Sequence, residues 1–280
     1  MEIQQYINKI KLIQANFMKF IDNEEIEFDD LKSLIDSTNI ASNKYDLKLF
    51  LYFLSSIANN YKHEPNLFHK IESLKSNYKN QITTFFTKSE IYQIFKENNR
   101  NLLSLIEAGI LTKDDFNSSD YFTSEDKNNC EKGENDSFIC ELIRNDSVEQ
   151  FIAYVNQKNY QLSSKKNKSI YETNTFLLNK TPTLIEYAAF FGSIQIFNYL
   201  RMSKVQLKPS LWIYSIHSNH PDLIHLLEQN NVEPDDKSFK NCLEEAIKCH
   251  HNAIANYIYD NLLQEQDEKF LFSKAVQYYN

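Results

Sequence analysis

Four potential metal ligands lie close together near the C-terminal end of the sequence: Cys242, Cys249, His250 and His251. Cysteine and histidine are common zinc ligands, and a separation of seven residues is about two helical turns, so a helix would align the two cysteines. The repeat register described below, however, places Cys249 on an exposed face and both histidines in a turn between helices. We therefore expect a polar turn here, with no bound metal and no cofactor.

Three other histidines, His217, His220 and His225, could supply a catalytic base. No Ser, Cys or carboxylate partner accompanies them at a defined spacing, so a surface role is favoured. The chain has 3 glycines, too few and too far apart for a phosphate-binding loop. It also lacks the His-Glu-x-x-His, Cys-x-x-Cys and Gly-x-Ser-x-Gly motifs. The sequence therefore predicts that the protein is not an enzyme.

Composition indicates a globular protein with an acidic surface. Hydrophobic residues make up 42% of the 280 residues, and the net charge is −8. An excess of acid disfavours nonspecific binding to nucleic acid, because that binding depends on neutralising phosphates. The densest apolar stretch, residues 49–58, is too short to cross a membrane, and the first residues show no secretory signal. We expect a cytoplasmic monomer with 4 free thiols and neither a nucleic-acid nor a membrane partner.

The elements that must position any site are helices. Residues 1–116 carry apolar residues at three- and four-residue steps, which predicts an N-terminal helical region. Its apolar stripes lie near residues 3–17, 31–35, 47–57, 67–74, 91–95 and 102–106. Thr87 and Glu90 form a capping box, and Gly109 is a plausible helix stop. Residues 117–136 are polar and acidic, which predicts a flexible linker.

From residue 137 to the end, one register recurs: an apolar anchor followed three residues later by a small or aliphatic pair. The anchors are Ile139, Ile185, Trp212, Leu243 and Phe272. If Gly192 is the turn between two helices of one unit, the equivalent turn positions are Asp146, Asn219, His250 and Tyr279. The later steps are about 30 residues long, which is typical of a helix-turn-helix repeat. The longer first step predicts an insertion at about residues 157–182.

The register also predicts which residues are buried. Trp212 occupies an anchor position and is expected in the core. The last register begins at Phe272 and the sequence stops at Asn280, so we expect an incomplete last repeat that leaves Phe270, Phe272 and Val276 without a covering helix.

Residues 183–192, which read TLIEYAAFFG, followed by Ile196, Phe197 and Leu200, resemble an ankyrin repeat. Glu186 stands where that repeat usually has His, and Leu184 where it usually has Pro. Together with residues 139–147 and 249–252, the pattern is similar to a divergent ankyrin-like domain of unknown function that is expanded in anaerobic protists. The resemblance covers about the second half of the chain. It implies an all-α protein with an α-solenoid used for protein interaction, and no catalytic residues.

The solenoid interpretation predicts a concave face formed by the first helix of each repeat. The partner-binding candidates on it are Tyr187, Phe190, Phe191, Tyr214, His217, Glu245 and Lys248. Aromatic side chains on a rigid scaffold are typical anchors of protein interfaces. The alternative is that the aromatic residues pack against the insertion.

The leading hypothesis is a scaffold that binds an unknown protein partner through the concave face and loops. Alternatively, the chain is an adaptor or regulatory subunit of an enzyme complex that docks through its N-terminal helices. A metal-binding protein is the third, less favoured possibility.

Overall fold

A computed structural model describes residues 2–22, 26–61, 67–115, 132–169, 171–172, 174–178 and 180–280. These residues form helices and no strand, apart from one isolated β-bridge, which confirms the all-α prediction. None of the described helices has the length and apolar character needed to span a membrane. Cys130 and most of the predicted linker lie outside the described residues. The chain divides into two compact units, Met1–Ala58 with Glu64–Tyr121 and Tyr279–Asn280, and Asn59–His63 with Phe122–Tyr278.

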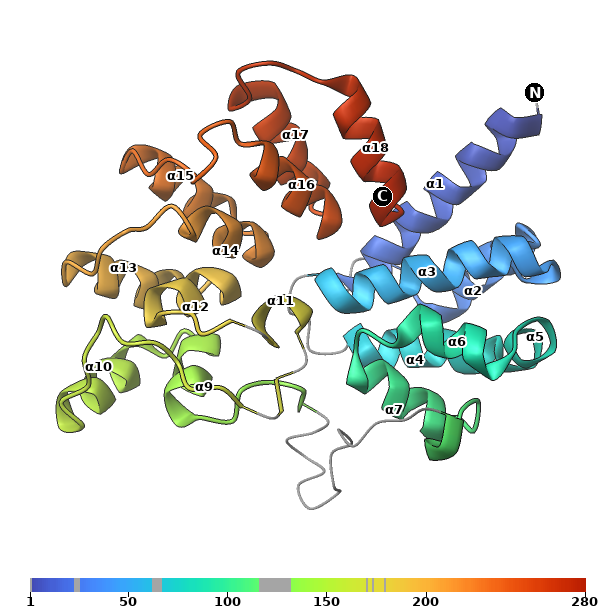
Figure 1. Ribbon diagram of the computed structural model, residues 1–280, viewed down its shortest axis with the longest axis horizontal. Helices are drawn as coiled ribbons and strands as arrows, with labels where there is room; N and C mark the ends of the chain where they lie inside the picture. The colour runs from blue at the N-terminus through green and yellow to red at the C-terminus, as the bar shows by residue number, and fades with distance from the viewer. Residues whose placement is uncertain are drawn as a thin grey trace. The chain divides into compact units, whose positions relative to one another are not determined.

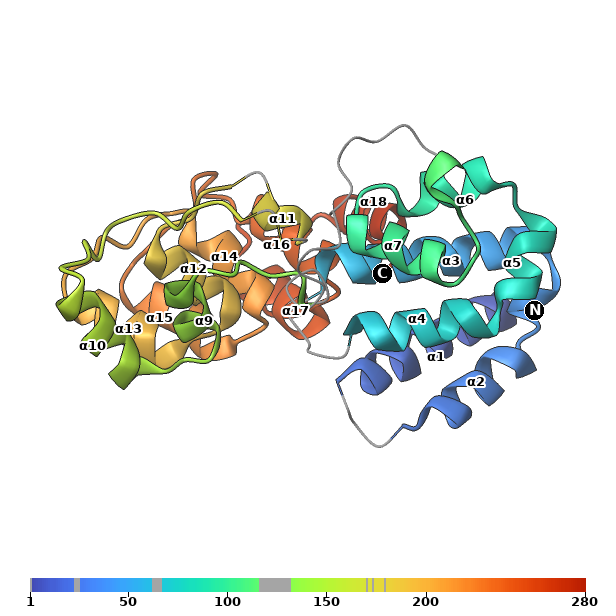
Figure 2. The ribbon, with the colours of Figure 1, turned by 90° about the horizontal axis from the view of Figure 1, so that it is seen from below.

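Unit 1 is a compact group of helices (Figures 1 and 2). They are α1 (Glu2–Ile21), α2 (Phe28–Ser37), α3 (Lys44–Asn60), α4 (Leu67–Asn77), α5 (Lys79–Phe85), α6 (Lys88–Phe95) and α7 (Asn99–Glu107). The sequence predicted each of these except α5. The Thr87 and Glu90 capping box is present, and Gly109 has a left-handed backbone with φ +63°, as a helix stop requires.

Unit 2 consists mainly of consecutive helix pairs. The pairs are α9 (Phe138–Arg144) with α10 (Val148–Gln157), α12 (Leu184–Phe191) with α13 (Ile194–Met202), α14 (Leu211–Ser218) with α15 (Pro221–Gln229), and α16 (Lys240–Lys248) with α17 (Asn252–Asn261). A four-residue helix, α11 (Thr175–Leu178), precedes the second pair, and α18 (Glu268–Tyr278) follows the last. Pro221 begins α15, where the first helical turn tolerates its missing N–H.

The first helices of successive pairs pack on one another, α9 on α12, α12 on α14, α14 on α16 and α16 on α18. The second helices form another layer, in which α10 contacts α13 (Figure 1). Each pair therefore packs mainly against the pairs before and after it in the sequence. The first helices, α9, α12, α14, α16 and α18, together form one continuous face, which we call the inner face.

The turns between paired helices lie at the positions that the repeat register predicted. Asp146, Gly192, Asn219, His250 and Tyr279 all have positive φ, between 47° and 71°. A left-handed residue ends a helix by turning the chain, so that its amide can bond to a carbonyl of the last turn. All five predicted turn positions thus have the left-handed conformation, although glycine occurs at one of them.

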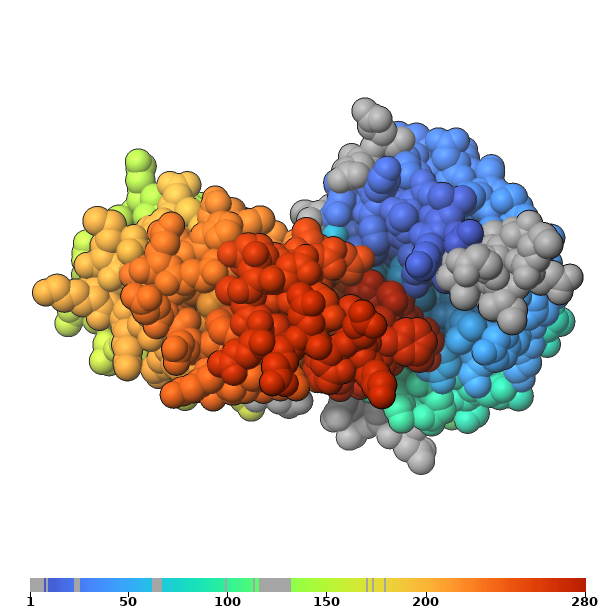
Figure 3. Space-filling view, turned by 90° about the horizontal axis from the view of Figure 1, so that it is seen from above, coloured from blue at the N-terminus to red at the C-terminus, as the bar shows by residue number. Residues whose placement is uncertain are grey.

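Four of the five predicted anchors are in the core. Ile139, Ile185, Trp212 and Leu243 are at most 5% exposed, and the indole N–H of Trp212 donates to the Val232 carbonyl. The fifth anchor, Phe272 in α18, is 71% exposed. Helix α18 packs on α16 through another face, where Lys274 and Tyr278 both bond to Glu244. Phe272 and Val276 lack a covering helix, as expected, and Figure 3 shows these C-terminal helices in red at the surface.

Candidate functional site

The inner face does not present the predicted partner-binding residues to solvent. Tyr187, Phe190, Tyr214 and His217 are 0%, 2%, 6% and 1% exposed, so the prediction that they are exposed is wrong. Phe191, Glu245 and Lys248 are half-buried. The cause is the insertion, whose described residues between 165 and 182 lie against the inner face (165–169, 171–172, 174–178 and 180–182); we call this segment the covering loop. Tyr187, Phe190 and Tyr214 contact residues of the insertion, as the alternative interpretation expected.

The covering loop is closed at its base by backbone pairing. Lys165 and Thr183 form an antiparallel β-bridge, and the amides of Lys166 and Leu184 donate to the carbonyls of Pro182 and Ser164. Thr183 is also the N-cap of α12 and forms a capping box with Glu186. The loop therefore leaves and rejoins the stack at one place.

An aromatic cluster holds the middle of the covering loop. Phe176 of α11 stacks on Phe190 with ring centroids 5.8 Å apart and meets Tyr214 edge-on at 5.0 Å. Its centroid lies 4.1 Å from the His217 ring, and the Lys180 ammonium lies 3.4 Å from it. Burial lowers the pKa of Lys180. One aromatic side chain of the loop thus contacts residues from both α12 and α14.

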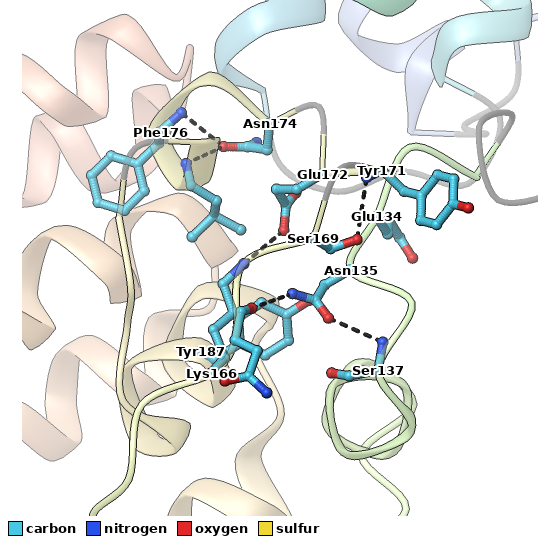
Figure 4. A network of polar contacts seen from close by, with 12 residues as sticks. Glu134, Asn135, Ser137, Lys166, Ser169, Tyr171, Glu172, Asn174, Phe176 and Tyr187 are labelled. Carbon is cyan, nitrogen blue, oxygen red and sulfur yellow. Dashed lines mark hydrogen bonds and ion pairs between the residues drawn. The ribbon is translucent and has the colours of Figure 1, made fainter. Parts of the chain in front are cut away.

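A buried ion pair holds the first half of the loop (Figure 4). The Lys166 ammonium is 3.0 Å from the Glu172 carboxylate, and the two side chains are 2% and 4% exposed. The same ammonium lies 5.1 Å from the centroid of the Tyr187 ring on α12. Burial raises the pKa of Glu172, although Lys166 opposes this effect. The pair satisfies two charges that would otherwise be costly to bury.

The residues just before α9 join this network. Asn135 donates to the Asn167 carbonyl at 2.8 Å, and Arg144 donates to the Tyr187 hydroxyl at 3.0 Å. Arg144 also forms a 2.7 Å ion pair with Glu134. Asn135 is 1% exposed, so the end of the predicted linker is part of the packed structure. Its composition alone does not reveal these partners.

A second polar group lies under the aromatic cluster, between α14 and α16. The His217 Nε2 atom is 2.8 Å from a Glu245 carboxylate oxygen, and the Cys249 sulfur is 3.4 Å from His217 Nδ1. The Lys248 ammonium is 3.0 Å from the same Glu245 oxygen. The structure thus brings together His217, Glu245 and Lys248, three of the predicted candidates, and adds Cys249.

Electrostatics assigns these groups their protonation states. Burial lowers the pKa of His217, so the imidazole is neutral at pH 7. Burial opposes ionisation of Glu245, but its hydrogen bond from His217 and the Lys248 charge lower its pKa overall. Burial raises the pKa of Cys249 well above its usual value, and the Glu245 charge acts in the same direction. The group is therefore a thiol, a neutral imidazole, a carboxylate and an ammonium.

The zinc ligands considered from the sequence do not converge. His251 bonds through Nδ1 to the Ile216 carbonyl at 2.8 Å, which is a structural role in the turn. Within the described residues, the one group with metal-ligand geometry consists of His217, Glu245 and Cys249, whose ligand atoms lie within 4.8 Å of one another. His217 lies about one repeat before Glu245 and Cys249. In the register His217 corresponds to Lys248, which lies between Glu245 and Cys249 in sequence, so a search for ligand residues near the ends of adjacent first helices could have found this group.

A scan against models of protein families finds no match, and searches of curated proteins and of solved structures find none either.

Proposed function

We propose that this protein is an ankyrin-like helical-repeat protein that binds a protein partner on its inner face, and that the covering loop is an internal ligand of that face. The observation that carries the proposal is the seating of Phe176 among Phe190, Tyr214 and His217. A face of regular helices that holds one aromatic side chain from a short helical segment has the properties of a peptide-binding surface.

The contacts define what such a partner carries. The inner face supplies three aromatic rings to a single phenylalanine, and the phenylalanine is followed four residues later by a lysine that lies over its ring. Burial lowers the pKa of Lys180, and the Glu245 charge opposes this effect, so a negative charge lies nearby. A partner segment with an aromatic residue, a following base and one turn of helix would make the same contacts.

Catalysis is not supported by the same residues. Cys249, His217 and Glu245 have the order of a thiol nucleophile, its base and an orienting carboxylate. An activated cysteine needs a lowered pKa and access to substrate. Cys249 is 0% exposed and its pKa is raised, so this thiol is not an activated nucleophile.

The test uses the covering loop as its own probe. A fluorescein-labelled peptide of residues 165–182 is titrated into the full chain carrying Phe176→Ala, and into the wild type. In the wild type the loop competes at an effective concentration of about millimolar, so the peptide should bind the variant at least about tenfold more tightly. A peptide that itself carries Phe176→Ala is the matched control and should bind neither chain.

Equal, weak binding of both peptides to both chains would show that the inner face does not recognise this segment as a ligand. If the peptide binds as expected, affinity capture with the Phe176→Ala chain and the wild type, analysed by mass spectrometry, identifies partners. The proposal expects partners that the variant enriches, because its inner face is more accessible.

A second candidate function is the adaptor, favoured by the division of the chain into two units with separate cores. An adaptor would bind one partner through unit 1 and another through unit 2. Substitutions of exposed unit 1 residues, such as Tyr45→Ala, which changes a side chain that is 69% exposed, should then abolish capture of one set of partners only. Loss of every partner, or of none, would count against two separate surfaces.

A further inference from the structure

We infer that His217, Glu245 and Cys249 form a binding site for one zinc ion between α14 and α16. Imidazole nitrogen, thiolate sulfur and carboxylate oxygen are the three ligand types that zinc takes in proteins, and each residue here supplies one of them. The inference does not depend on the proposed protein-binding function.

The backbone places the three ligands in fixed positions. Glu245 and Cys249 are four residues apart at the end of α16, so they lie on one side of that helix. His217 comes from the adjacent helix α14, which packs directly on α16. A site on two packed helices is held more rigidly than a site on loops.

The three ligand atoms lie within 4.8 Å of one another, and side-chain rotations are needed to bring them to tetrahedral zinc. Zinc bound at about 2.0 Å from nitrogen and about 2.3 Å from sulfur would separate the two ligand atoms by about 3.5 Å. Nitrogen and oxygen ligands would be about 3.3 Å apart. His217 Nε2 is 4.0 Å from the Cys249 sulfur and 2.8 Å from the Glu245 oxygen. These two distances therefore have to change by about half an ångström each. The sulfur is closer to Nδ1, at 3.4 Å, so the imidazole ring and the thiol also have to turn relative to one another before Nε2 and the sulfur can share a zinc ion.

The burial of the thiol, which argues against an activated nucleophile, does not exclude a metal ligand. A coordinated metal ion stabilises the thiolate directly, so the proton leaves as the sulfur–metal bond forms. The Cys249 proton is released to solvent, and the proton that His217 Nε2 donates to Glu245 moves to Nδ1, which frees the Nε2 lone pair for the metal. The zinc charge is balanced by the thiolate and the Glu245 carboxylate. Glu245 has a side-chain exposure of 15%, so the group reaches solvent through this residue, and a water molecule can occupy the fourth position.

Lys248 is the feature that opposes metal binding. Its ammonium lies 3.0 Å from the Glu245 oxygen, so it competes with a cation for that carboxylate. The Lys248 side chain is 25% exposed and can turn towards solvent when the metal binds. Replacing it therefore has the opposite effect from replacing a ligand, which gives the inference a second and independent test.

The experiment titrates the purified full chain, after treatment with chelator and reductant, with Co²⁺ and then with Zn²⁺. Cobalt reports tetrahedral thiolate coordination by its visible bands and by a charge-transfer band in the near ultraviolet, and zinc should displace it with a 1:1 stoichiometry. Cys249→Ser and His217→Gln should weaken binding at least about a hundredfold and remove the charge-transfer band or shift the visible bands. Lys248→Gln should tighten binding by about tenfold.

The matched control is Cys242→Ser, because Cys242 is a cysteine of the same helix and equally buried but outside the group. Its cobalt spectrum should equal that of the wild type. The inference is overturned if the wild type binds no stoichiometric zinc, or if Cys249→Ser and Cys242→Ser bind equally well. Circular dichroism shows whether Cys249→Ser folds. If it does not fold, the Lys248→Gln variant decides, and the inference is overturned if this variant binds zinc no more tightly than the wild type.

Discussion

Replacing Phe176 with alanine should release the covering loop while leaving the helix stack folded. The ring is the central contact of the loop and is 8% exposed. A buried aromatic side chain removes about 150–250 Å² from water, which at about 25 cal/mol per Å² is about 4–6 kcal/mol. The expected loss is smaller, because the released loop still shields part of the Phe176 ring from water and because alanine keeps the β-carbon. We expect the docking free energy of the loop to fall by about 3 kcal/mol.

This loss should appear as local opening, not as global unfolding. The loop rejoins the stack where it leaves it, so its detachment need not separate the packed helices. A loss of about 3 kcal/mol corresponds to a more than hundredfold increase in the open population. The amides of Lys166, Leu177 and Lys180, which bond within the loop or across its base, should therefore exchange with solvent more than a hundred times faster.

Native-state hydrogen exchange followed by mass spectrometry measures this effect. Phe138→Ala is the matched control, because Phe138 is also a phenylalanine of unit 2 but is 51% exposed, and it should leave the exchange of residues 165–182 unchanged. Unchanged exchange in the loop of Phe176→Ala would refute the energetic argument. A parallel increase in α12 and α14 would show that the loop is part of the core and not a bound segment.

Three further predictions concern single features of the two units. Glu172→Gln should destabilise the covering loop by about 3–5 kcal/mol, since it leaves Lys166 buried without its carboxylate. Lys166→Met combined with Glu172→Leu should restore most of the lost stability, and hydrogen exchange of the loop amides measures both changes. Gly192→Ala should lower the free energy of unfolding by about 1–2 kcal/mol in urea titrations because φ is +71°, and Gly192→Asn should cost less, since Asn219 holds the same conformation in the next pair. Lys75→Met should stabilise unit 1 by up to about 3 kcal/mol at pH 7, because burial lowers the pKa of Lys75 to about 8 from 10.5. That advantage should disappear between about pH 8 and 10.5, where the unfolded chain still binds the proton that the folded chain has lost; urea midpoints of both proteins at pH 7 and pH 10 check it.

The helices and turns were predictable because their signals are local. A left-handed turn depends on a few consecutive residues, and the recurrence of apolar anchors marked the same position in each repeat even where Asp146 or His250 replaced glycine. The capping boxes at Thr87 and Thr183 are equally local. For the same reason α5 was missed, since its seven residues bury only Ile82.

The burial of the inner face was not predictable from the register, because it depends on where an irregular insertion folds. The register correctly identified Tyr187, Phe190 and Tyr214 as residues on the inner side of the stack, but it carries no information on what lies over them. The usable signal was Phe176, Leu177 and Leu178, an apolar triplet in an otherwise polar stretch. Such a triplet needs a partner surface, and the aromatic residues of the first helices were the surface available.

The polar contacts of the covering loop bear on whether it can be displaced. The Lys166 and Glu172 charges lose their hydration when the loop docks, so the ion pair contributes less to docking than its buried area suggests. Most of the docking energy then comes from Phe176. A partner that offers the same aromatic contact from a separate molecule must compete with the tethered loop at its effective concentration. The apparent affinity of the partner is its affinity for the open form multiplied by the fraction of molecules in which the loop is open. Each 1.4 kcal/mol removed from the docking of the loop should therefore strengthen partner binding about tenfold, until the open form predominates.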